Sequence, residues 1–145
     1  MFVVDTNLLI YAAMFDASQH EPARAWLRGC TRGDRPWFAT WSTVYEFLRV
    51  TTHRRAYPHP LSFAQVVEFL AAVRRSPSFG ILTETDRHPD VLADLAREHP
   101  QLAGNIMHAL HTVALMREHG IREIHTAVKD FTRFRELRVV NPLAA

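Results

Sequence analysis

The chain has 145 residues, of which 48% are hydrophobic and 22% are charged, and its formal net charge is +2. This composition is typical of a globular protein, and the length predicts one domain over residues 1–145. The apolar runs are as long as strands and too short to span a bilayer, which excludes a membrane-spanning class. The start of the chain lacks the pattern of a signal peptide, and Cys30 is the only cysteine, so we expect a cytoplasmic protein without disulfides.

Short apolar runs alternate with helical patterns in the first half of the chain. Residues 2–5 and 37–40 are predicted strands, and residues 7–14 are a predicted helix. Ser18 and Ser42 are the expected N-caps of the next two helices, because a serine hydroxyl can accept a hydrogen bond from a free backbone N–H.

The second half of the chain continues this alternation. Pro58 and Pro60 predict a loop, and Ser62 is expected to cap the helix that follows it. The remaining expected elements are a strand at 79–82, a helix with Pro89 in its first turn, a helix from Asn105 to Gly120, and strands at 121–126 and 138–141. Because helices alternate with short strands throughout, the sequence predicts an α/β fold with a central, mostly parallel sheet between layers of helices.

Three acidic residues stand at positions where a sheet of this kind binds its ligands. Asp5 directly follows the first predicted strand, and the carboxyl ends of parallel strands form the ligand edge of open α/β folds. Glu46 lies in an otherwise apolar helix, and Asp130 follows a later strand. Together these carboxylates indicate a site for a divalent cation. Each also has a structural alternative: Asp5 as a helix N-cap, Glu46 as a solvent-facing helix residue and Asp130 as a turn residue.

Several other side chains have two interpretations. His108 and His111 stand three residues apart and could bind zinc, but no third ligand follows at a zinc-like spacing, so we expect no zinc site from this pair. Arg54 and Arg55 could contact RNA or form solvated surface. The three tryptophans, Trp26, Trp37 and Trp41, are expected in the core rather than on a surface that stacks bases.

Short motifs along the whole chain occur in a distinctive order. They are Val4 to Leu9, Thr43 to Phe47, Thr51 to His53, Pro58 to Ser62, Gly104 to His108, Glu118 to Gly120, Thr126, Asp130-Phe131, Arg133-Phe134 and Val140 to Leu143. In this order and spacing, the chain resembles the PIN-domain family, and within it the VapC-type toxins of bacterial toxin–antitoxin pairs. The resemblance implies a PIN-like α/β/α sandwich.

The resemblance also implies an activity. Members of this family are metal-dependent endoribonucleases in which four acidic positions hold Mg²⁺ or Mn²⁺ against RNA. Carried over to this chain, the catalytic acids are Asp5, Glu46 and Asp130, and Asp5 and Asp130 are the metal ligands. The supporting residues are Thr6, Asn7 and Thr126, and the RNA contacts are Arg49, Arg54 and Arg55. A homodimer and a cognate small antitoxin are implied as well.

Two of the four acidic positions are not acidic in this chain. The third lies four residues after Asn105 and is Ala109, and the fourth lies two residues after Thr126 and is Val128. An impaired ribonuclease is therefore expected, with a non-catalytic module that binds antitoxin or RNA as the alternative. Each change requires one nucleotide, so natural drift and deliberate substitution both remain open. A receiver-like signalling domain is disfavoured, because the strand at 37–40 carries no acid.

Overall fold

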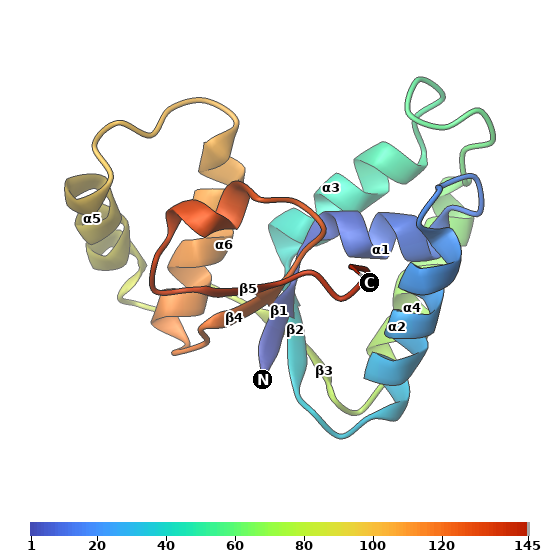
Figure 1. Ribbon diagram of the computed structural model, residues 1–145, viewed down its shortest axis with the longest axis horizontal. Helices are drawn as coiled ribbons and strands as arrows, with labels where there is room; N and C mark the ends of the chain where they lie inside the picture. Colours follow the sequence, from blue (N-terminus) through green and yellow to red (C-terminus); the bar gives the residue numbers. More distant parts are fainter. Residues whose placement is uncertain (145) are drawn as a thin grey trace.

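The computed structural model describes residues 1–144, and its strands form one parallel five-stranded sheet (Figure 1). The strands are β1 (Phe2–Val4), β2 (Trp37–Thr40), β3 (Phe79–Leu82), β4 (Glu123–His125) and β5 (Arg138–Val140). Their order across the sheet is β3-β2-β1-β4-β5, so the first strand of the chain is the central one. The predicted α/β fold with a mostly parallel sheet is confirmed.

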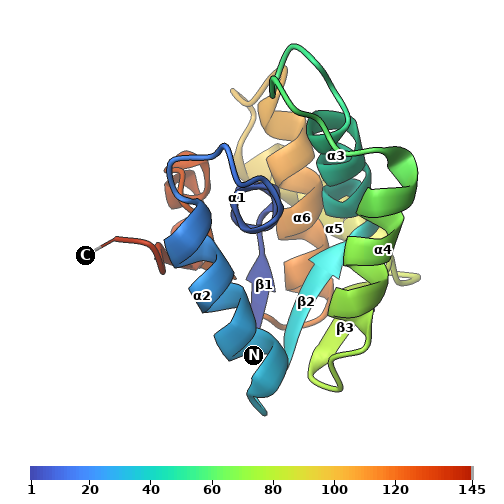
Figure 2. The ribbon, with the colours of Figure 1, turned by 90° about the vertical axis from the view of Figure 1, so that its right-hand side faces the viewer.

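Helices cover both faces of this sheet. They are α1 (Thr6–Ala13), α2 (His20–Arg32), α3 (Trp41–Thr51), α4 (Phe63–Arg74), α5 (His88–Glu98) and α6 (Ile106–Glu118), with a short 3-10 helix η1 (Asp130–Arg133) before β5. Figures 1 and 2 show α1 to α4 on one side of the sheet and α5 and α6 on the other. None of the described helices is long and apolar enough to cross a membrane.

Each helical layer packs on its own hydrophobic core. Phe2 and Val4 of β1 point into the core beneath α1 to α4, where Trp37 and Phe47 are fully buried. Val3, between them in sequence, points to the opposite core, which α5 and α6 cover. Successive side chains of a strand alternate between faces, so a strand buried on both faces must be apolar at every position. The run Phe-Val-Val therefore explains the central place of β1.

The structure corrects two of the predicted helix starts. Ser62 caps α4 as predicted, in a capping box with Gln65. Ser18 does not cap α2, which begins after Gln19, and Ser42 does not cap α3. Thr40 caps α3 instead: it is the last residue of β2, and its hydroxyl accepts a hydrogen bond from the backbone N–H of Thr43 at 3.2 Å. The strand therefore passes directly into the helix, which leaves no room for a later cap.

The tryptophan prediction is wrong at one position. Trp37 is completely buried and Trp26 is half-buried against the core beneath α1 to α4. Trp41 is 48% exposed. It is the first residue of α3, and the buried side of that helix is formed by later residues, among them Val44 and Phe47.

Candidate functional site

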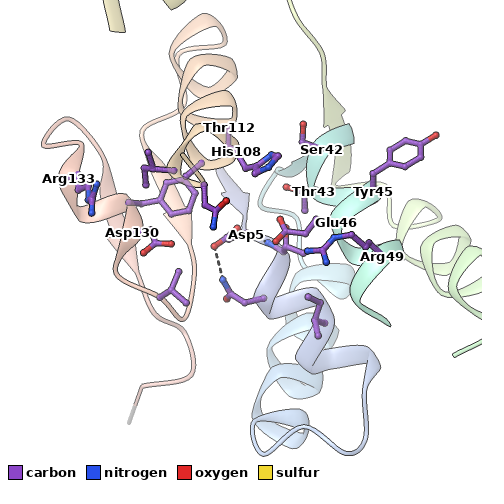
Figure 3. Close-up of a pocket in the computed structure, with 18 of the residues that line it drawn as sticks. Asp5, Ser42, Thr43, Tyr45, Glu46, Arg49, His108, Thr112, Asp130 and Arg133 are labelled. Carbon is purple, nitrogen blue, oxygen red and sulfur yellow. Dashed lines mark hydrogen bonds between the residues drawn. The ribbon is translucent and has the colours of Figure 1, made fainter. Parts of the chain in front are cut away.

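The three predicted acids line one cleft at the carboxyl edge of the sheet. Asp5 follows β1, Glu46 lies on α3 and Asp130 begins η1, and all three face a cavity of about 990 Å³. In Figure 3 the carboxylate of Asp5 lies between those of Glu46 and Asp130. Ala109 on α6 and Val128 line the same cleft. The fold thus brings the acids and the two non-acidic positions to a common space.

Asp5 is held by three hydrogen bonds. Its Oδ1 accepts from the backbone N–H of Thr6 at 2.8 Å, so Asp5 is also the N-cap of α1. Its Oδ2 accepts from the side-chain amide of Asn7 at 2.6 Å and from the hydroxyl of Thr126 at 2.8 Å. The capping interpretation and the functional interpretation of Asp5 are therefore compatible, because capping uses one carboxylate oxygen and fixes the direction of the other.

Asn7 and Thr126 connect the two ends of the chain behind Asp5. The amide of Asn7 donates to the Thr126 hydroxyl at 3.0 Å, and its Oδ1 accepts from the backbone N–H of Ala127 at 2.9 Å. The Thr126 hydroxyl also accepts from the backbone N–H of Val128 at 3.2 Å. These contacts join the start of α1 to the turn after β4 and set the position of Asp5 relative to that turn.

Glu46 and Asp130 are more exposed than Asp5. The hydroxyl of Thr6 donates to Glu46 Oε2 at 3.0 Å, which orients the carboxylate of Glu46 across the gap between α1 and α3. Asp130 is exposed at the start of η1 on the opposite side of the cleft. Two of the acids are therefore free to reach a ligand, and the half-buried Asp5 is fixed between them.

The electrostatics at Asp5 favour a bound cation. Burial raises the pKa of Asp5, hydrogen bonds from Thr126, Thr6 and Asn7 lower it, and the charge of Glu46 raises it further, with a net rise. A carboxylate whose charge is disfavoured in this way is stabilised by a nearby positive ion.

The donor atoms fit a divalent cation in kind but do not form a complete cage. Carboxylate oxygens are the ligands that Mg²⁺ and Mn²⁺ prefer. Within residues 1–144, however, Asp5, Glu46 and Asp130 do not form a group whose oxygens all lie within 4.8 Å of one another. Ala109 and Val128 line the cleft without offering a ligand atom. The residues present therefore fit an ion held partly through water.

Basic and polar side chains complete the cleft. Arg49 of α3 and Arg133 of η1 line it, whereas Arg54 and Arg55 are exposed on the loop after α3 and do not. Arg133 was not among the predicted RNA contacts, although it follows Asp130 by one turn of helix. Ser42, Tyr45, His108 and Thr112 line the cleft and were also missed. Helical spacing from Glu46 on α3 and from Ala109 on α6 could have indicated Ser42 and Thr112, because residues three or four positions from a site residue share its face of the helix.

Comparison with known proteins identifies the family. The PIN domain family matches residues 2–137. Ribonuclease VapC37 of Mycobacterium tuberculosis is 34% identical over 149 residues, and ribonuclease VapC33 of the same species is 31% identical over 146 residues; each alignment covers 99% of both proteins. The chain belongs to the PIN-domain family, among the VapC ribonuclease toxins of toxin–antitoxin systems.

Solved structures share the fold of this PIN domain. VapC20 of Mycobacterium tuberculosis, a toxin that cleaves the sarcin–ricin loop, superimposes with a TM-score of 0.61 at 18% identity and covers 92% of this chain and 94% of its own. VapBC2 from Rickettsia felis, solved bound to a DNA fragment from its promoter, gives a TM-score of 0.67 at 15% identity with 97% of each chain covered. This chain is therefore similar to VapC proteins in the arrangement of its sheet and helices as well as in sequence.

Proposed function

We propose that the chain is the toxin of a toxin–antitoxin pair and that its metal-dependent endoribonuclease activity is impaired. One observation carries this proposal: Ala109 and Val128, at two acidic positions of the PIN family, line the same cleft as Asp5 and Asp130. A methyl and an isopropyl group stand where the family places oxygen ligands. The cleft still carries Asp5, Glu46 and Asp130, but the negative charge available to a cation is reduced.

The remaining residues have separable roles in this proposal. Asp5 and Asp130 would hold Mg²⁺ or Mn²⁺, with Glu46 as the third catalytic acid; such an ion, when bound, supplies a more acidic water and neutralises phosphate charge. Asn7 and Thr126 fix the carboxylate of Asp5, and Thr6 fixes that of Glu46.

RNA would be held by arginines on both sides of the cleft. Arg49 and Arg133 line it, and a guanidinium group matches the geometry of phosphate oxygens. Arg54 and Arg55 would extend this contact to flanking nucleotides along the loop after α3.

Restoring the missing acids tests the proposal. Loss of one preorganised charge-stabilising group lowers a rate by about 10²–10³-fold. The parent chain should therefore cleave structured single-stranded RNA barely or not at all with Mg²⁺ or Mn²⁺, Ala109→Asp should recover cleavage, and Ala109→Asp/Val128→Asp should raise it further. Adding Asp5→Ala should abolish the gain.

The matched control is Ala103→Asp, which adds a carboxylate to the same cleft at a position that is not a family ligand. It should not restore cleavage. Efficient cleavage by the parent chain, with no effect of Ala109→Asp, would show that residue 109 is not the vacant ligand position.

The second candidate is a non-catalytic module that binds an antitoxin. Trp41 and Tyr45 are 48% and 67% exposed on α3, and Tyr45 lines the cleft, which gives a protein partner an apolar surface beside the site. We propose a cognate small antitoxin as the partner and a homodimer as the assembly. Co-expression with a candidate antitoxin encoded by a small open reading frame next to the gene, followed by light scattering on the purified complex, tests both. If Ala109→Asp/Val128→Asp folds and binds the antitoxin but never cleaves RNA, the module has no catalytic role.

A further inference from the structure

A second group of potential ligands lies outside the set of acids described above. Glu84 is on the loop after β3, His88 is the first residue of α5, and His111 is in the middle of α6. One ligand atom from each of these side chains lies within 4.8 Å of the other two. The three residues come from different elements and are brought together only by the packing of α5 on α6.

Hydrogen bonds already orient both imidazole rings. Nε2 of His111 is 2.6 Å from Glu84 Oε1, and its Nδ1 is 2.6 Å from the hydroxyl of Ser42 on α3. Nδ1 of His88 is 2.7 Å from Oε2 of Glu118, and the two imidazole rings are 5.8 Å apart and nearly perpendicular. Each ring thus has one nitrogen fixed by a group outside the cluster.

The partner of His88 is itself firmly placed. The side chain of Glu118 is fully buried, and its Oε1 accepts hydrogen bonds from the backbone N–H and the hydroxyl of Thr85, both at 2.8 Å. A carboxylate that receives the Nδ1 proton of a histidine leaves Nε2 as the coordinating nitrogen. This arrangement of carboxylate, histidine and metal is common in zinc sites, where the outer group fixes the tautomer and raises the basicity of the ligand.

We propose that Glu84, His88 and His111 bind one divalent transition-metal ion of the zinc type. Two imidazoles and one carboxylate suit Zn²⁺ and do not suit Mg²⁺, which prefers oxygen ligands. His88, His111 and Glu84 are 24%, 28% and 49% exposed, so an ion can enter and a water molecule can complete the coordination. Coordination bonds of about 2.0–2.2 Å require the cluster to contract, and the loop position of Glu84 permits this.

The bound ion would act as a structural clamp. It would join the loop after β3 and the first residue of α5 to the centre of α6. Through Ser42, which contacts His111 and also lines the acidic cleft, it would fix the start of α3 as well. This role is independent of the proposed ribonuclease function, because it requires neither Asp5 nor Asp130.

Metal titration of the untagged, chelator-treated full chain tests the proposal. Calorimetry with Zn²⁺ should show one ion per chain, and Co²⁺ should give the visible absorption of a four-coordinate site. Ser42→Ala, which removes only an orienting group, should weaken binding by about 10–100-fold. Glu84→Gln, His88→Ala and His111→Ala should weaken it more, and Zn²⁺ should raise the Tm of the parent chain but not of these variants.

Two controls separate this cluster from the acidic cleft. His108 lies one helical turn from His111 and lines the acidic cleft, and Asp5 is the central acid of that cleft. The control variants are His108→Ala and Asp5→Ala. Both should leave Zn²⁺ affinity unchanged. Unchanged affinity in Glu84→Gln and His88→Ala, or abolished affinity in His108→Ala or Asp5→Ala, would overturn the proposal. Circular dichroism without metal checks folding, and Glu84→Gln, at an exposed loop position, decides the test if a histidine variant does not fold.

Discussion

The side-chain amide of Asn7 joins two parts of the site that are far apart in the chain. It donates to Asp5 and Thr126 and accepts from the backbone of Ala127. The hydroxyl of Ser or the methyl of Ala could not make all of these contacts, because only an amide offers donors and an acceptor in one plane. This residue therefore couples the stability of the fold to the geometry of the acid.

We predict that Asn7→Ala lowers the free energy of unfolding by about 2 kcal/mol, because several partly buried hydrogen bonds lose a partner. Urea denaturation of the parent and variant measures this difference. Asn105→Ala is the matched control: Asn105 precedes α6 without a capping hydrogen bond from its side chain. Its unfolding free energy should change by less than about 0.5 kcal/mol. Equal effects of the two substitutions would mean that the Asn7 contacts contribute nothing net.

A buried histidine and its neighbours make stability depend on pH. His125 Nε2 donates to Glu123 at 2.8 Å and Nδ1 accepts from Trp26 at 3.2 Å, so the ring is held neutral. Burial lowers the pKa of His125, and the hydrogen bond to Glu123 only partly opposes this. Burial raises the pKa of Glu123, but hydrogen bonds from His125 and Arg35 outweigh this effect, so the pKa of Glu123 is lowered overall.

Both shifts favour the fold at neutral pH over acid. A lowered histidine pKa gives stability that is lost as pH falls below about 6.5, and a lowered glutamate pKa gives stability that is lost below about 4.3. We predict that Glu123→Gln costs about 1 kcal/mol of unfolding free energy at pH 7 and that its difference from the parent decreases as the pH falls below about 4.3. Denaturant midpoints across this range test the prediction, with the exposed Glu21→Gln as control. A difference that does not decrease with falling pH would exclude the charge of Glu123 as its cause.

At the scale of elements, the strands were easier to predict than the starts of helices. The predicted strands at 37–40 and 79–82 match β2 and β3. A short apolar run bounded by turn residues is typical of a buried strand and is too short for a helix. A serine near a helix start identified the cap only at α4, because the cap depends on where the preceding chain enters the helix. Thr40 caps α3 because β2 runs directly into that helix, whereas α2 follows α1 and begins after Gln19, which makes no side-chain capping bond.

The correct and incorrect caps give a matched pair of substitutions. We predict that Ser62→Ala lowers the unfolding free energy by about 1 kcal/mol, since it disrupts the capping box at α4. Ser18→Ala should be near neutral, because α2 begins after Gln19. Thermal unfolding of the two variants side by side measures the difference. A larger destabilisation by Ser18→Ala would show that α2 begins earlier in solution.

At the scale of the molecule, the sequence predicted the acidic cleft but not the histidine cluster. Asp5, Glu46 and Asp130 were assigned to one edge because each follows a strand or lies on a helix that begins there. Glu84, His88 and His111 carry no spacing that marks them, and the sequence instead pairs His111 with His108. The structure separates that pair: His108 lines the cleft, and His111 contacts Ser42 and Glu84. Only the packing of α5 against α6 reveals the cluster.

RNA binding tests the proposed basic surface of the whole molecule. In an Asp5→Ala background, which prevents cleavage, we predict that Arg49→Ala/Arg133→Ala weakens binding and makes it less sensitive to salt. The slope of log K against log salt should fall by about 0.7 for each phosphate that an arginine no longer neutralises. Fluorescence anisotropy at several salt concentrations measures both the affinity and this slope.

The remaining arginines provide the comparison for this experiment. Arg54→Ala/Arg55→Ala should also reduce the slope, whereas Arg24→Ala/Arg28→Ala, on exposed positions of α2, should leave it at the parent value. If Arg54→Ala/Arg55→Ala has the same slope of log K against log salt as the parent, the loop after α3 is solvated surface that does not contact RNA. Equal reductions for all three pairs would indicate nonspecific attraction to the overall charge.

The order β3-β2-β1-β4-β5 also determines when the cleft can exist during synthesis. The central strand β1 is made before both of its neighbours in the sheet, and one of them, β4, is made only after helices α1 to α6. Asp5 thus emerges well before Thr126, which holds it, and Asp130, which faces it across the cleft. The acidic cleft of a nascent chain therefore stays incomplete until the segment that carries Thr126 and Asp130 has been synthesised.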